Sequence, residues 1–110
     1  MADVLKVLGQ VTPGDTNNTT LYTVPENTQT TISSIVACNI TGGGLTFRIA
    51  IQPKGASIDN KHYIYYGKAV SANDSVFVMI GITLSDDDVV TVQSSSADDI
   101  SFSIFGVETS

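Results

Sequence analysis

Apolar and polar residues alternate along much of the chain with a period of two. In residues 45–52 the apolar positions are Leu45, Phe47, Ile49 and Ile51. The same alternation recurs at Val76, Val78, Ile80 and Ile82, and at Ile100, Phe102 and Ile104. Successive side chains of a β-strand lie on opposite faces of a sheet, so each segment offers one apolar face to a core. The pattern predicts strands, and no long window has the spacing of an amphipathic helix.

Turn residues divide the chain into short segments. Pro13-Gly14 has the order that a type II turn prefers, and Gly42-Gly43-Gly44 stands between two alternating runs, as a hairpin tip would. We expect eight strands, near residues 4–11, 20–24, 29–40, 45–52, 61–66, 75–84, 88–94 and 99–108. Eight strands joined by short polar turns predict an all-β fold, a two-sheet antiparallel sandwich of either the jelly-roll or the immunoglobulin-like type.

A chain of 110 residues is long enough for one domain, so we interpret residues 1–110 as a single β-sandwich domain. Its first strand differs from the others because both faces carry apolar residues, which indicates burial on both sides. Two interpretations stay open for residues 1–11. They form either an N-terminal arm that contacts another subunit or a central strand of the domain's own sheet. The candidate intersubunit residues are Val4, Leu5, Val7 and Leu8.

Charged side chains are few and mostly acidic. The chain has 11 acidic and five basic residues, a net charge of −6. Such a surface repels phosphate backbones and anionic lipids, which argues against nucleic acid and membranes as partners. The N-terminus lacks the features of a signal peptide, and no apolar stretch reaches the ~20 residues of a membrane span. We expect synthesis in a reducing cytoplasm, with Cys38, the single cysteine, as a buried small hydrophobe.

Residue types that carry catalysis are scarce. His62 is the only histidine, and the chain has no Gly-x-Ser-x-Gly motif. A zinc site needs three or four Cys and His ligands, and the chain offers two. The run Asp86-Asp87-Asp88 lacks the spacing of a calcium loop, so we interpret it as a solvated turn. We therefore predict that the protein is not an enzyme and has no catalytic residue, cofactor or metal site.

Three tyrosines lie close together in residues 61–66. In a regular strand Tyr63 and Tyr65 share one face and Tyr66 lies on the other. We expect at least one of the three in the core. Exposed tyrosines in a concave patch are typical of a glycan-binding surface, so Tyr63, Tyr65 and Tyr66 are candidate surface-binding aromatics. A structural subunit should instead have apolar area at its contacts with other subunits.

Two parts of the chain resemble a group of small virion structural proteins of tailed bacteriophages. The first is residues 21–39, LYTVPENTQTTISSIVACN. The second comprises KHYIYY at 61–66, NDS at 73–75, GITL at 81–84, DVVTV at 88–92 and FSIFGVE at 102–108. Members of this group are capsid decoration, head-fibre or tail-associated proteins. The resemblance covers most of the chain after about residue 19, and its motifs are strand-and-turn patterns that bring no catalytic residue with them.

The resemblance implies a structural protein of the virion, made in the host cytoplasm. The first function it suggests is a capsid decoration, or cement, protein that binds the outer lattice of the major capsid protein and stabilises it. Decoration proteins sit at local threefold positions, which implies a homotrimer. The alternatives are a tail, fibre or neck structural subunit, and a glycan- or receptor-binding module.

Overall fold

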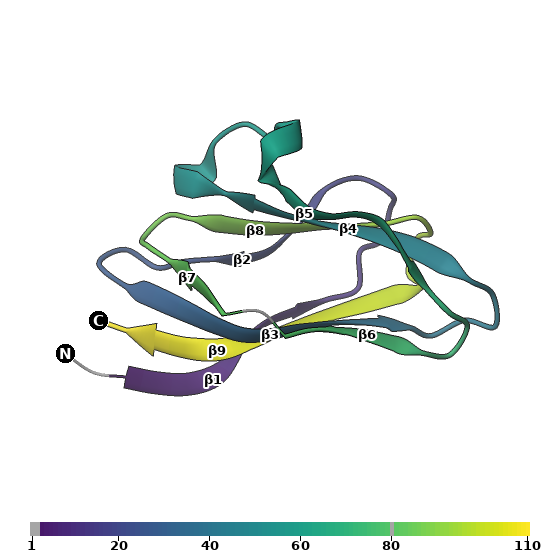
Figure 1. The fold of residues 1–110 in the computed structure, drawn as a ribbon, viewed down its shortest axis with the longest axis horizontal. Helices are drawn as coiled ribbons and strands as arrows, with labels where there is room; N and C mark the ends of the chain where they lie inside the picture. Colours follow the sequence, from purple (N-terminus) through teal and green to yellow (C-terminus); the bar gives the residue numbers. More distant parts are fainter. Residues whose placement is uncertain (1–2, 80) are drawn as a thin grey trace.

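The structure, a computed structural model that describes residues 3–79 and 81–110, consists of two facing antiparallel β-sheets (Figure 1). Sheet A contains, in spatial order, β1 (Asp3–Val11), β9 (Ile100–Thr109), β3 (Gln29–Asn39) and β6 (Ser75–Val78), and β7 (Ile82–Leu84) also pairs with β3. Sheet B contains β2 (Thr19–Thr23), β8 (Val89–Ser94), β4 (Leu45–Gln52) and β5 (Tyr63–Val70). The expected all-β sandwich is confirmed.

The chain changes sheet at most of its connections. Only β4 with β5, and β6 with β7, are consecutive strands of one sheet. The spatial orders β1-β9-β3-β6 and β2-β8-β4-β5 are those of a jelly roll. An immunoglobulin-like sandwich instead keeps its first two strands in one sheet. Of the two arrangements that the sequence left open, the strand order therefore matches the jelly roll.

Three expectations about turns and strands need correction. Gly42-Gly43-Gly44 is not a hairpin tip, because β3 and β4 belong to different sheets and the loop crosses between them. The expected strand 75–84 is split into β6 and β7, and its residue 80 lies outside the described residues. The expected strand 61–66 begins later, at Tyr63, because residues 60–62 form a short 3-10 helix, η2 (Asn60–His62), after η1 (Pro53–Gly55).

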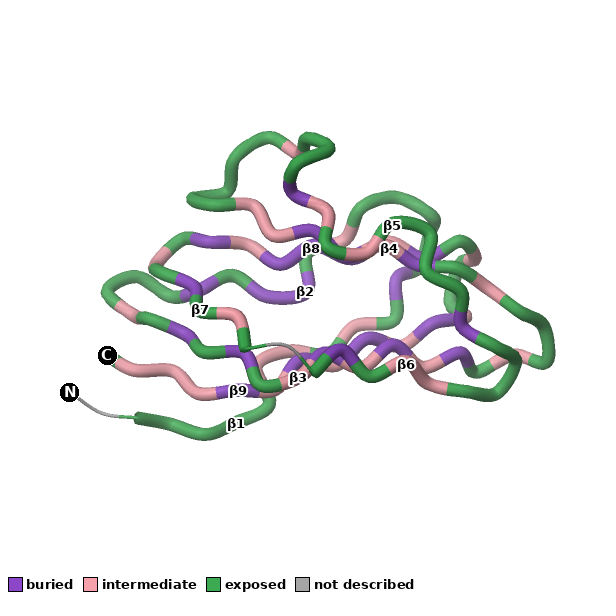
Figure 2. The backbone as a smooth tube through the Cα atoms, viewed as in Figure 1, coloured by how far each residue is buried: buried purple, intermediate pink, exposed green. Residues whose placement is uncertain are grey.

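The core lies between the two sheets and contains the alternating residues that the sequence singled out. Phe47 and Ile49 of β4 are buried, as are Ile100, Phe102 and Ile104 of β9. The rings of Phe47 and Phe102 meet edge to face across the core, with centroids 5.9 Å apart. In Figure 2 buried residues recur along the strands of both sheets, whereas β1 has no buried residue and is exposed along most of its length.

Asn39, the last residue of β3, stabilises the loop that crosses from sheet A to sheet B. Its side chain is almost completely buried, and its Nδ2 donates to the carbonyl oxygens of Gly43 (2.8 Å) and Val70 (3.2 Å). Its Oδ1 accepts from the backbone N–H of Thr41 (2.9 Å) and from the Thr41 hydroxyl (2.7 Å). A buried amide with both ends bonded fixes the path of the glycine loop at little cost.

Candidate protein-binding face

β1 is an edge strand of the protein's own sheet A, so it is neither a central strand nor an arm detached from the domain. It pairs with β9 from Asp3 opposite Thr109 to Val11 opposite Phe102, with a bulge at Leu8. Leu8 and Val11 pack against the core, but Leu5 is 80% exposed and Val7 is 51% exposed. The bulge also turns Gly9 inward toward Leu21, away from the face of Leu5 and Val7 on which a regular strand would place it.

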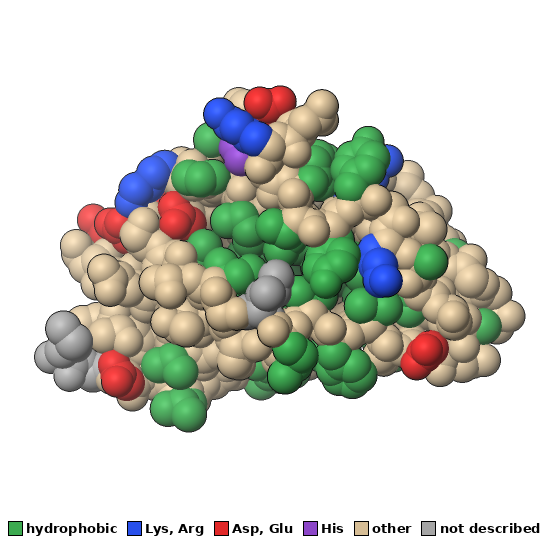
Figure 3. Space-filling model, viewed as in Figure 1, with side chains coloured by type: hydrophobic (Ala, Val, Ile, Leu, Met, Phe, Trp, Pro, Cys, Tyr) green, Lys and Arg blue, Asp and Glu red, His purple; other side chains and the backbone are tan. Residues whose placement is uncertain are grey.

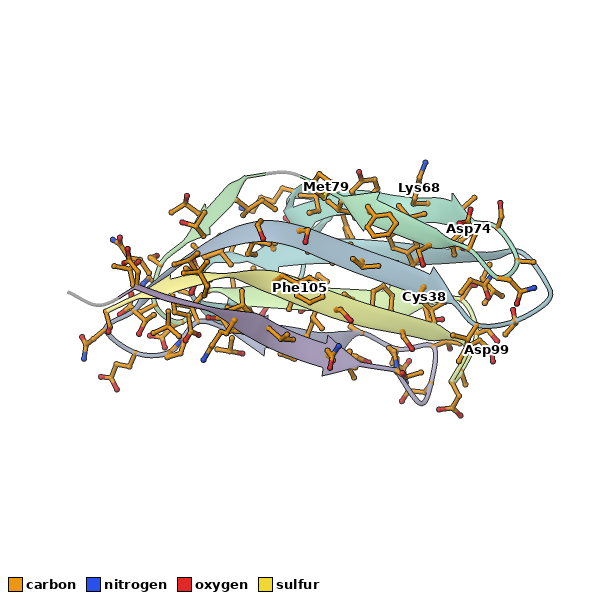
Figure 4. All side chains as sticks on the ribbon, turned by 90° about the horizontal axis from the view of Figure 1, so that it is seen from below. Cys38, Lys68, Asp74, Met79, Asp99 and Phe105 are labelled. Carbon is orange, nitrogen blue, oxygen red and sulfur yellow. The ribbon has the colours of Figure 1, made fainter. Side chains whose placement is uncertain are left out.

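Apart from Asp3 at one end, the described residues on the outer face of sheet A carry no charged side chain over four neighbouring strands. We call it the A face and define it by Leu5, Val7 and Gln10 of β1, Ser101, Ser103, Phe105 and Val107 of β9, Thr31, Ser34, Val36 and Cys38 of β3, and Ser75 and Phe77 of β6. Figure 4 looks onto this side of the molecule and shows Phe105 near the centre of the sheet.

The strand register places apolar side chains in rows across the A face. Val7 lies opposite Phe105 in one row. In the next row, Val36 lies between Ser103 of β9 and Phe77 of β6, and the Phe77 side chain is 63% exposed. The outward side of a solvated antiparallel sheet is normally polar. Exposed Leu, Val and Phe residues among small hydroxyl residues instead indicate a surface that other protein covers.

Acidic residues lie at the two ends of the A face. Asp3 marks one end of the face, where its carboxylate accepts from the Thr109 hydroxyl at 2.8 Å. Asp74 and Asp99 lie at the other end, in the loops beside the last residues of β3 (Figure 4). In a protein with a net charge of −6, this distribution leaves one face that can be desolvated without burying a charge.

Cys38 is not the fully buried side chain that its apolar neighbours suggested. It is half-buried on the A face, because Ala37 and Asn39 on either side of it point into the sandwich. The alternation of β3 is regular from Ser34 onward, so an outward position for residue 38 follows from the inward position of Ile35.

A chain of polar contacts fixes β1 against β9 and β2. The ammonium group of Lys6 lies 2.7 Å from Oε1 of Glu108, and the Tyr22 hydroxyl donates to Oε2 of Glu108 at 2.5 Å. The Tyr22 oxygen is also 2.8 Å from the Thr30 hydroxyl. Burial, and then the Glu108 carboxylate, raise the pKa of Tyr22 to about 12, while Lys6 and then Tyr22 hold the pKa of Glu108 below its ordinary value.

Stability at alkaline pH is expected to depend on Tyr22. Its pKa of about 12 in the folded protein exceeds the ordinary value of 10.0, so the folded state favours the neutral hydroxyl. This contribution is complete below about pH 10 and is lost as the pH rises toward 12. Tyr22→Phe should therefore flatten the alkaline loss of stability, measured as the free energy of urea unfolding from about pH 8 to pH 12. An equally steep loss in the variant would contradict the assignment.

The tyrosines of β5 are arranged differently from the expectation. A bulge at Ile64 shifts the register between Tyr63 and Tyr65, so Tyr63 and Tyr66 share the outer face of sheet B. Tyr65 points inward, where its ring lies 6.0 Å from that of Phe47. The expectation that at least one of the three tyrosines joins the core is thus confirmed, but the pairing of Tyr63 with Tyr65 on one face is wrong.

Tyr63 and Tyr66 form a corner of two perpendicular rings on sheet B. Their centroids are 4.9 Å apart at 84°, and they border a shallow depression of about 390 Å³ with Asn60. The guanidinium carbon of Arg48 lies 3.9 Å from the centroid of the Tyr66 ring, which is 62% exposed. Residues 53–62 lie over the outer side of the same sheet (Figure 1). The basic side chains visible in Figure 3 also gather on this half of the molecule.

The residues considered for catalysis or metal binding have structural partners. Nδ1 of His62 accepts the backbone N–H of Asp59 at 3.0 Å and so caps η2. Asp88 is buried, which corrects its assignment to a solvated turn, and its carboxylate accepts the backbone N–H groups of Lys54 and Ser85, both at 2.9 Å. Within residues 3–79 and 81–110, no group of three or more His, Cys, Asp or Glu side chains is placed to hold a metal ion.

Comparison of the chain with protein families, with curated proteins and with solved structures finds no match. In the described part of the chain, no helix has the length and apolar character needed to cross a membrane. The sequence indicated Leu5 and Val7 for the A face, but it did not indicate Phe105, Val36 or Phe77.

Proposed function

We propose that this protein is a structural component of a bacteriophage virion, most closely a capsid decoration protein that binds the outer capsid lattice and stabilises it. The observation that carries the proposal is the A face. The core of a protein–protein interface is depleted in charged residues and enriched in aromatic ones, and the A face combines both features. The resemblance of residues 21–39 and 61–108 to phage virion proteins supports the choice of a virion.

The proposed role is structural rather than catalytic. His62 and Asp88, the side chains best suited to acid–base or metal chemistry, accept backbone N–H groups: His62 that of Asp59 in its own turn, and Asp88 those of Ser85 in its own turn and of Lys54 in η1. These hydrogen bonds stabilise the turns and so contribute to a rigid domain. A rigid domain suits a decoration protein because its effect is one of mass action: a protein that binds only the assembled lattice stabilises that lattice.

The location of the protein on phage particles tests this proposal. Gold-labelled antibody against the protein should bind intact particles produced by the phage that carries the gene, with label spread over the head. Label confined to the tail, fibre or neck would replace the decoration role with the alternative structural role. Particles that carry no label, although the protein is present in the lysate, would overturn the virion assignment.

A second candidate function, glycan binding, is favoured by the tyrosine corner. Sugars present apolar C–H faces that stack on tyrosine rings, and Asn60 and Arg48 bring polar hydrogen-bonding groups close to them. Saturation-transfer NMR with a panel of cell-surface glycans should then show binding that Tyr66→Ala abolishes. Phe77→Ala, which removes an exposed aromatic ring from the A face, is the matched control and should leave binding intact. No transfer from any glycan would remove this candidate.

A further inference from the structure

We propose that the outer face of sheet B binds an acidic oligosaccharide, a glycan whose sugars carry carboxylates, and that Arg48 binds one of these carboxylates. The inference rests on the second candidate function, glycan binding, and names the class of glycan. The observation that carries it is an arginine without an acidic partner, which lines one surface depression and stacks on a tyrosine of another.

The strand register places Arg48 in the middle of this face. Arg48 of β4 lies between Tyr66 of β5 and Gln93 of β8, in one row across three strands. Its guanidinium carbon lies 3.9 Å from the centroid of the Tyr66 ring, and its Nη1 donates to Oε1 of Gln93 at 3.4 Å. Gln93 is held in turn, because its Nε2 donates to the carbonyl oxygen of Thr16 at 2.7 Å. These contacts position the guanidinium before a ligand binds, which lowers the entropic cost of binding.

Within the part of the chain that the structure describes, no carboxylate pairs with Arg48. The ion pairs there join Lys6 to Glu108 and Lys54 to Asp86. The chain has 11 acidic residues and five basic ones, so a shortage of acids does not explain this. A guanidinium has five N–H donors, and its planar edge matches the two oxygens of a carboxylate. Arg48 therefore retains N–H donors for the carboxylate of a ligand.

The charges near Arg48 also favour an anion. The strands of sheet B contain two basic residues, Arg48 and Lys68, and no aspartate or glutamate. Asp15 and Asp59 adjoin the two depressions in sequence, and each carboxylate accepts a backbone N–H of its own loop. An acidic ligand therefore meets attraction on this face, rather than the repulsion that a net charge of −6 would otherwise cause.

The two depressions favour an oligosaccharide over a single ion. One, of about 390 Å³, lies at the tyrosine corner, where a ring can stack on the apolar face of a sugar. The other, of about 180 Å³, is lined by polar groups that suit sugar hydroxyls, among them those of Thr16, Thr46, Arg48, Gln93 and Ser95. Neighbouring strands are about 4.8 Å apart, so the row from Tyr66 to Gln93 spans roughly 10 Å, which is room for more than one sugar unit.

Isothermal titration calorimetry of the full-length protein with matched ligands tests the inference. Trigalacturonic acid and its methyl ester share one sugar chain and differ in charge. Sialyllactose and lactose, which lacks the acidic sugar, form a second pair. The wild type should bind at least one of the acids about tenfold or more tightly than its neutral counterpart, because hydrogen bonds between charged groups are the stronger ones. Raising the salt concentration should weaken the binding of the acid and leave that of the neutral ligand unchanged.

Variants of the basic residues assign the preference to Arg48. Arg48→Met should abolish the preference for the acid, whereas Arg48→Lys, which keeps the charge, should retain part of it. Lys54→Met is the matched control, because it removes the same charge from a residue that already pairs with Asp86 and lies beyond the end of β4. It should leave the preference intact. Arg48→Gln repeats the test should Arg48→Met fail to fold, which circular dichroism reports.

Equal affinity of the wild type for the acids and their neutral counterparts would overturn the acidic preference and leave glycan binding in place. A preference that survives in Arg48→Met would overturn the role of Arg48. Displacement of the acid by an equal concentration of inorganic sulfate would show a site for simple anions and overturn the sugar. The absence of binding to any of these ligands would also overturn the inference. The virion role is tested separately by the antibody label, so it stands or fails independently.

Discussion

Gly106→Ala is expected to destabilise the protein severely. A Cβ atom at this position would lie 2.2 Å from the carbonyl oxygen of Thr31 and 3.0 Å from the Cα of Ile32. Both are backbone atoms of β3, and Gly106 is also paired with Lys6 on its other side, so β9 has no room to move. We expect a loss of about 3 kcal/mol or more, at the upper end of what overpacking costs. The midpoint of urea unfolding measures it.

Gly43→Ala is the control for this substitution. No atom lies within 4 Å of the position that its Cβ would take, and the loop reaches solvent on that side. The change should stay within about 0.5 kcal/mol of the wild type. Beside Gly106 the pairing of β3 with β9 has a bulge between Ile32 and Ser34. Equal midpoints for Gly106→Ala and the wild type would show that the two strands separate more easily at this bulge than their pairing indicates.

The sequence predicted the parts of the fold that depend on local alternation. Phe47 and Ile49 of β4, and Phe102 and Ile104 of β9, are buried as their period-two pattern required. The pattern is dependable because a slip of one residue would expose every apolar side chain of the strand. The general class, two packed antiparallel sheets, followed from the number of such strands and the turns between them.

Bulges account for the errors within the strands. A bulge inserts one unpaired residue, so the side chains beyond it change face without any change in the alternation of the sequence. The bulge at Leu8 turns Gly9 inward, and the bulge at Ile64 brings Tyr63 and Tyr66 onto one face. A further bulge of β5 lies at Gly67, whose φ is +70°, and glycine is the residue that most readily adopts this conformation.

The A face was beyond prediction from the sequence for a different reason. Its residues come from β1, β3, β6 and β9, which are adjacent only because of the jelly-roll order. Each strand alone shows a few uncharged outward residues, such as Val36 or Phe105, and a single exposed apolar residue needs no explanation. Only the strand order shows that these positions form one uncharged surface.

Deleting residues 1–10 is expected to unfold the domain. β1 pairs with β9 along nearly its whole length, and Leu8 packs against the core. The deletion would expose β9 as a new edge, remove the Lys6 ion pair with Glu108 and uncover apolar area beside Ile104. The combined loss should amount to several kcal/mol, a large share of the ~5–15 kcal/mol that stabilises a domain of this size. Circular dichroism and urea unfolding measure the outcome.

Leu5→Ser separates this structural role of β1 from its place in the A face. The side chain is mostly exposed in the single chain, so its removal should change the unfolding free energy by no more than about 0.5 kcal/mol. The truncated chain should lose its cooperative unfolding transition, whereas Leu5→Ser should keep the transition. A truncated protein that stays folded with the stability of the wild type would instead support residues 1–11 as an arm whose pairing with β9 is dispensable. In that case the intersubunit contacts predicted for Val4, Leu5, Val7 and Leu8 would require that copies of the chain exchange β1.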